Sequence, residues 1–176
     1  GEMYVDALFK AAQAADAVRS VSASAADYLL PLAYRTRCLF KMDWALRGPI
    51  PWRDPDCARA ATVHLSGDLE HVAQGEALVH RGAAGESPFA ILVQPSLFDP
   101  TRAPPERHTA WAYCHVPHGS ERDFSDAIES VIERFAPRFR DLVLARHCMT
   151  AGQLERYNAN YVGGDITGGM SDLGQL

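Results

Sequence analysis

The residues best suited to chemistry in this sequence are Cys114, His115 and His118, which form a C-H-x-x-H cluster. Thiolates and imidazoles bind metal ions, but a metal site needs three or four ligands that converge at fixed distances. Segment 108–116 alternates like a β-strand, so Cys114 and His115 should point to opposite faces, and Pro117 should turn the chain before His118. We therefore expect a structural thiol and two partly exposed imidazoles, with no metal site.

The sequence also lacks the motifs of a serine nucleophile and of a phosphate-binding loop. Ser66, Ser96 and Ser171 lack the G-x-S-x-G context of a nucleophile elbow. The richest glycine stretch, 163–169, precedes no helix that could receive a pyrophosphate, and no G-x-G-x-x-G fingerprint occurs. The sequence identifies no catalytic residue, and we expect no cofactor-binding residue in this chain.

Large side chains gather on one face of two predicted strands, 37–47 and 108–116. Two interpretations remain open: they fill a core between sheet and helices, or they line an apolar ligand cavity. On the second strand we expect the aromatic face to be open, because its small face can pack beneath a helix. That small face consists of Ala110, Ala112 and Cys114. Five side chains are the substrate-facing candidates: Phe40, Trp44, Trp111, Tyr113 and His115.

Composition limits the classes of function. The 176 residues suit one domain; 47% are hydrophobic and 22% charged, and the net charge is −5 with scattered basic residues. This excludes a nucleic-acid stripe. The cysteines form no CxxC pair and the N-terminus lacks a secretory signal, so we expect reduced thiols and a cytoplasmic location. The longest apolar runs are too short for a membrane span.

The periodicities predict an α+β fold. Strands are expected at 37–47, 60–65, 88–94, 108–116 and 141–147, and helices at 67–81, 122–136 and 150–157. From residue 60 the order is β-α-β-β-α-β, which is typical of a ferredoxin-like core. We therefore expect a mixed, mainly antiparallel sheet of about five strands with helices on one face.

Three segments carry further expectations. Helical spacing predicts a helical lead-in over 1–36. The proline-rich loop 95–106 is either a rigid surface loop or a lid, and both interpretations remain open. The Glu and Arg residues of the predicted helix 122–136 are expected on a solvated face.

Several segments together resemble the phytoene-desaturase-like family of NAD(P)/FAD-dependent oxidoreductases, in order and spacing, over about residues 38–176. They read FKMDWAL (40–46), PIPW (49–52), QPSLFDPTRAP (94–104), WAYCHVP (111–117), ERFAP (133–137) and NYVGGDI (160–166). Glu106 stands where the resemblance leads us to expect a glycine.

The resemblance implies that the chain is the substrate domain, over 37–157, of a larger flavoenzyme, with a glycine-rich tail, 158–176, leading back to a missing FAD domain of the same polypeptide. It implies hydride transfer between flavin and an apolar substrate, with FAD in the parent protein and none on this chain alone. The alternative is a stand-alone ferredoxin-like module that binds a ligand or forms a homodimer through an exposed sheet face. No nucleic-acid partner is expected.

Overall fold

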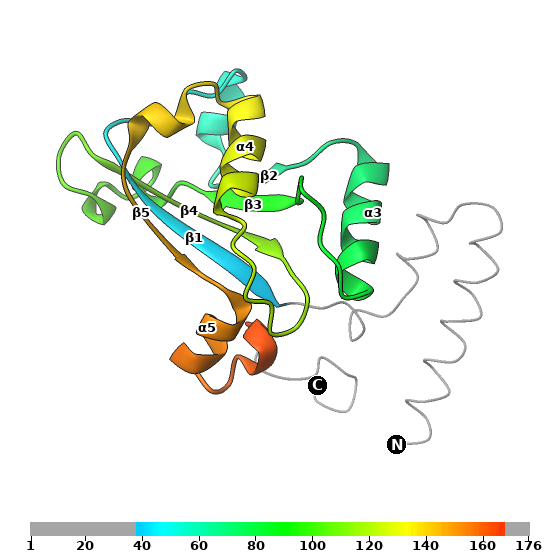
Figure 1. Cartoon of the computed structure of the whole chain (residues 1–176). Helices are drawn as coiled ribbons and strands as arrows, with labels where there is room; N and C mark the ends of the chain where they lie inside the picture. The colour runs from blue at the N-terminus through cyan, green and yellow to red at the C-terminus, as the bar shows by residue number, and fades with distance from the viewer. Residues whose placement is uncertain (1–37, 168–176) are drawn as a thin grey trace, which may run out of the picture.

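The computed structural model describes residues 38–167, which form a five-stranded sheet and three α-helices (Figure 1). The strands are β1 (Leu39–Leu46), β2 (Thr62–Leu65), β3 (Ala90–Val93), β4 (His108–His115) and β5 (Val143–Met149). The helices are α3 (Leu69–His80), α4 (Ser125–Phe135) and α5 (Ala151–Tyr157). The predicted α+β class is confirmed. The predicted lead-in 1–36 and the end of the tail lie outside the described residues.

The sheet has the strand order β2-β3-β4-β1-β5, and every neighbouring pair is antiparallel. It therefore contains no parallel neighbours, although the expected mixed sheet allowed for them. The ferredoxin-like detail is not confirmed. β4, α4 and β5 do form a split βαβ unit, because β1 lies between two strands that run in the same direction. β2 and β3, however, pair directly with each other.

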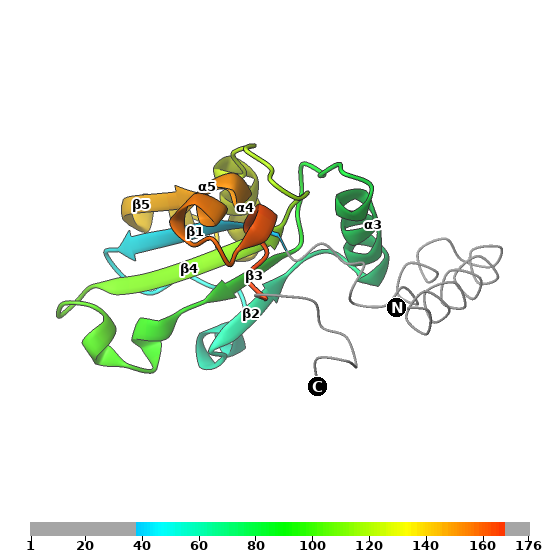
Figure 2. The same ribbon diagram turned by 90° about the horizontal axis from the view of Figure 1, so that it is seen from below.

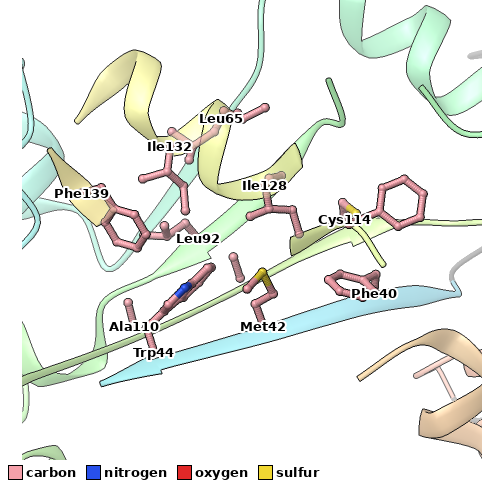
Figure 3. Packing of buried hydrophobic residues seen from close by; sticks show 14 of the residues in the cluster. Phe40, Met42, Trp44, Leu65, Leu92, Ala110, Cys114, Ile128, Ile132 and Phe139 are labelled. Carbon is pink, nitrogen blue, oxygen red and sulfur yellow. The ribbon is translucent and has the colours of Figure 1, made fainter. Parts of the chain in front are cut away.

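The core lies between the sheet and α4 (Figure 3). Helix α4 presents Ile128, Val131 and Ile132 at helical spacing, and all three are buried. Phe139, in the 3-10 turn Phe139–Leu142 that follows α4, closes one end of this layer. That turn also explains why β5 begins two residues later than predicted: Arg138 adopts φ 70°, and the chain turns once more before it extends.

The three helices lie in different places around the sheet. α4 covers one face, α5 lies on the other side, and α3 stands beyond the ends of the strands (Figures 1 and 2). The expectation that the helices at 67–81 and 122–136 share a face therefore differs from the structure. The physical reason is the direction of the strands that each helix connects. Helix α3 connects the antiparallel neighbours β2 and β3 and can lie beyond their ends, whereas α4 connects β4 and β5, which run in the same direction, and must cross over a face of the sheet.

The proline-rich loop 95–106 contains two 3-10 turns, Pro95–Leu97 and Pro100–Arg102. Buried Ser96 ties it to β4, because its hydroxyl accepts from the Thr109 N–H at 3.0 Å and lies 3.2 Å from His108 Nδ1. Glu106 adopts φ 60°, the left-handed conformation that favours glycine. The expectation of a glycine-like turn at this position thus has a structural basis.

Candidate functional site

The two strand faces that the sequence singled out lie on opposite sides of the sheet. Ala110, Ala112 and Cys114 of β4 are buried beneath α4, so Trp111, Tyr113 and His115 point away from that helix and are partly exposed. The expected orientation of the aromatic face of β4 is confirmed.

Phe40 and Trp44, the two other predicted substrate-facing residues, are instead core residues. They are 0% and 2% exposed. The register explains this, because Phe40 lies opposite Cys114 and Trp44 opposite Ala110 across the β1–β4 pair, and directly opposite residues share a face. Large side chains on β1 thus fill the space that small ones on β4 leave beneath α4 (Figure 3). The expectation that Phe40 and Trp44 face substrate is wrong.

The side of the sheet opposite α4 is the candidate site, and Figure 2 views the molecule from this side. We call it the open face; its central residues are Lys41, Asp43, Ile91, Val93, Trp111, Tyr113 and His115, all of them partly exposed. The β3–β4 register places Ile91 opposite Tyr113 and Val93 opposite Trp111. Two aliphatic and two aromatic side chains therefore form one apolar strip across β3 and β4.

Aromatic rings continue along β4 from this strip. The ring centroids of Trp111 and Tyr113 are 6.1 Å apart with an interplanar angle of 13°, and those of Tyr113 and His115 are also 6.1 Å apart. Burial raises the pKa of the Tyr113 phenol, so it remains a neutral hydrogen-bonding group. The strip thus has an apolar body with one hydroxyl near its α3 end.

His115 is held by a carboxylate from another element. Its Nδ1 lies 2.8 Å and 2.9 Å from the two carboxylate oxygens of Glu76 on α3, and each side chain is 23% exposed. Such a contact fixes the ring orientation and places a proton on Nδ1. No local spacing links these residues, which are 39 apart in sequence, so sequence reasoning could not find Glu76 as the partner of His115.

The flank of the open face on β1 carries one ion pair. Lys41 Nζ donates to both carboxylate oxygens of Asp43 and lies 5.9 Å from the centroid of the Trp111 ring, within the range of a cation–π contact. Alternation along β1 places both residues on the face opposite Trp44, but only the β1–β4 register, in which Asp43 lies opposite Trp111, shows that they border Trp111.

The side chains of the C-H-x-x-H cluster lie in different places, with Cys114 buried beneath α4 and His115 partly exposed on the open face. Burial first, and the charge of Glu76 second, raise the pKa of the Cys114 thiol to about 12, so it is neither a nucleophile nor a ready metal ligand. His118 lies instead against Gly163, where an added Cβ would come within 2.2 Å of the ring. Within residues 38–167, no group of three or more His, Cys, Asp or Glu residues could hold a metal ion.

A buried carboxylate braces the opposite side of the sheet. Glu129 of α4 is 3% exposed and accepts hydrogen bonds from Trp44 Nε1 at 3.1 Å, Arg140 Nε at 3.0 Å and Arg146 at 3.0 Å. The expectation that the charged residues of this helix are solvated is therefore wrong for Glu129. These partners come from β1, from the turn that follows α4 and from β5. Glu129 therefore holds α4 against the core face of the sheet, opposite the open face.

A surface hollow of about 450 Å³ lies near the C-terminal end of α4, away from the open face. It is lined by Arg53, Asp54, Cys57, Arg134 and Phe135. Burial, with Asp54 and Asp56 nearby, raises the pKa of Cys57, so this thiol is not activated. We find no chemistry there that matches that of the open face.

Comparison with known proteins relates the chain to an oxidoreductase-related protein. The chain is similar to pyridine nucleotide-disulfide oxidoreductase domain-containing protein 2 of Mus musculus. The two are 30% identical over 140 residues, which cover 72% of this chain and 24% of the mouse protein. The similarity points to an oxidoreductase-related domain, and the chain spans about a quarter of its relative's length.

The sequence matches no family model. Within residues 38–167, no helix is long and apolar enough to cross a membrane.

Proposed function

We propose that this chain is the substrate-binding domain of a FAD-dependent oxidoreductase of the phytoene-dehydrogenase-like kind. Its open face forms an apolar wall over the substrate, and hydride passes between that substrate and a flavin held by another domain of the same polypeptide. The cofactor supplies the redox chemistry, while this chain binds and orients the substrate and excludes water.

One observation carries the proposal: Trp111 and Tyr113 are partly exposed on a sheet face that does not contribute to the hydrophobic core beneath α4. The core beneath α4 is already filled by Phe40, Met42 and Trp44 with their aliphatic neighbours. Adjacent exposed aromatic side chains are typical of a binding surface. The 30% identity to an oxidoreductase-related protein supports a redox context for that surface.

The described residues do not themselves fit a flavin site. Gly163 and Gly164 have φ of 64° and 87°, and an added Cβ would meet His118 at the first and Ala151 at the second, so both glycines serve the close packing of this chain on itself. The proposal therefore assigns FAD to the partner domain and no cofactor-binding residue to this chain. It also keeps the cytoplasmic location expected from the four free cysteines.

The test uses the complete reading frame that encodes this chain. We expect it to contain G-x-G-x-x-G, and the purified protein to carry flavin. Trp111→Ala should then lower turnover of an apolar substrate by at least roughly tenfold without changing the flavin absorbance. Leu144→Ala is the matched control, because Leu144 is 47% exposed on the edge strand β5.

A reading frame that encodes no flavin domain would refute the proposal and leave the alternative, a stand-alone module that dimerises through the open face. That alternative predicts a dimer of the isolated chain in sedimentation equilibrium, which Trp111→Ala would dissociate.

A further inference from the structure

We infer that His115, oriented by Glu76, binds a neutral oxygen group of the substrate at the α3 end of the open face. The ligand class is an apolar molecule that carries one hydroxyl or carbonyl. The inference rests on the proposed function, since it uses the same face, and it adds which end of the substrate is polar and which residue binds it.

The geometry leaves one ring nitrogen for a ligand. Glu76 occupies Nδ1 of His115. Among residues 38–167, Nε2 has no hydrogen-bonding partner. It is also not a buried atom, so a ligand on the open face can reach it. Nε2 accepts a hydrogen bond in the neutral ring and donates one in the cation, so it can bind a hydroxyl or a carbonyl.

The surroundings of His115 favour an apolar molecule with one polar end. The Tyr113 ring lies next to His115, and Trp111 continues the row at the same 6.1 Å spacing. Ile91 and Val93 flank these rings on β3. A hydrocarbon chain along Trp111 and Tyr113 would bring its terminal group to His115, with the Tyr113 hydroxyl on the same side.

The charges on this face favour a neutral group over an anion. The carboxylate of Glu76 lies beside His115, and that of Asp43 lies beside Lys41. Lys41 and the His115 ring thus each have a carboxylate within hydrogen-bonding distance. A substrate carboxylate at His115 would be repelled by Glu76, whereas a hydroxyl or carbonyl would not.

The test compares three fluorescent tetraene probes on the full 176-residue chain: an alcohol, the matched hydrocarbon with methyl in place of hydroxymethyl, and the carboxylic acid. We expect the alcohol to bind roughly tenfold more tightly than the hydrocarbon, the value of one good hydrogen bond. His115→Phe keeps a ring and should bring the ratio of alcohol to hydrocarbon affinity down to about one. Tighter binding of the acid than of the alcohol would overturn the inference.

The outcomes separate this inference from the proposed function. If Trp111→Ala weakens all three probes but His115→Phe leaves the alcohol preference intact, the His115 inference fails and the apolar wall stands. If the wild-type chain binds no probe, or Trp111→Ala has no effect, both fail. An equal loss for alcohol and hydrocarbon in His115→Phe would show that the pair merely tethers α3, and would overturn the inference.

A second measurement does not depend on the variant's folding. In wild-type protein, the ¹⁵N resonance of His115 Nε2 should shift on addition of the alcohol and stay unchanged with the hydrocarbon. Glu76→Gln keeps an acceptor for Nδ1–H, so it should retain the alcohol preference. An Nε2 resonance that does not respond to the alcohol would contradict the inference.

Discussion

At the scale of single residues, Trp44 and Trp111 lie in neighbouring strands and serve opposite faces. Trp44 packs edge-on against Phe139 at 5.4 Å and donates to buried Glu129. Trp111 stacks beside Tyr113 on the open face. An indole in the core loses many packing contacts on truncation, whereas a partly exposed one loses few.

The first prediction compares these two tryptophans. Trp44→Ala should cost ~3–5 kcal/mol of unfolding free energy, the usual value for a core Trp, and Trp111→Ala under ~2 kcal/mol. Chemical denaturation of both variants measures this difference. A full core penalty for Trp111→Ala would mean that Trp111 belongs to the packing and not to a binding face.

The second prediction concerns Glu129 and acid. Burial alone would raise its pKa, but the hydrogen bonds from Trp44, Arg146 and Arg140 outweigh burial and lower it below the usual 4.5. A lowered folded-state pKa contributes stability that is present above pH 4.5 and is lost as the pH falls through the folded pKa. Glu129→Gln should therefore cost ~2–3 kcal/mol at neutral pH, and the cost should shrink under acid.

Urea denaturation of both proteins over a pH series tests this. The lowered pKa values of Asp99, Glu121 and Asp123 are common to both proteins and cancel in the difference. A difference in stability that does not change with pH would contradict the role given to the Glu129 charge.

Residue patterns predicted one face correctly and the other wrongly for a physical reason. Alternation along β4 was sufficient, because small Ala110 and Ala112 contrast with large Trp111 and Tyr113 on a single strand. Alternation along β1 shows that Phe40 and Trp44 share a face, but not which face. That depends on the register between β1 and β4, a contact between distant segments.

At the scale of elements, two glycines have contrasting roles. Gly164 has φ 87°, and an added Cβ would lie 2.6 Å from Ala151 Cα, so it allows the tail to pack on the start of α5. Gly75 lies within α3, and nothing lies within 4 Å of its added Cβ.

The third prediction uses this contrast. Gly164→Ala should destabilise the chain by at least ~2 kcal/mol, through left-handed strain and a backbone clash. Gly75→Ala should stabilise it by ~0.5–1 kcal/mol, because alanine is the better helix former. Thermal unfolding of the two variants measures both effects. If Gly164→Ala is neutral, the tail does not pack as described.

Element positions followed from periodicity, whereas their arrangement did not. Each strand and helix expected within residues 38–167 exists, and Thr150 caps α5 in a capping box with Gln153. The strand order could not be predicted, because inserting β1 between β4 and β5 leaves no mark on any local pattern. The same limit applies to Glu76, whose pairing with His115 depends on where α3 lies.

At the scale of the whole molecule, we propose that this chain binds the substrate and that another domain of the same polypeptide binds FAD. The fourth prediction follows from the missing fingerprint and the packed glycines. The isolated chain should purify colourless and bind FAD weakly or not at all, by visible absorbance and by titration. A yellow protein with stoichiometric flavin would contradict this division.

The most direct measurement of the central claim is photoaffinity labelling of the isolated chain with an apolar alkyl diazirine, followed by peptide mass spectrometry. The account predicts that the label concentrates on the open face, at Ile91, Val93, Trp111 and Tyr113, and that excess unlabelled tetraene alcohol competes it away. Labelling concentrated at the hollow near Phe135, or spread over the surface without competition, would contradict the claim that this sheet face binds an apolar substrate.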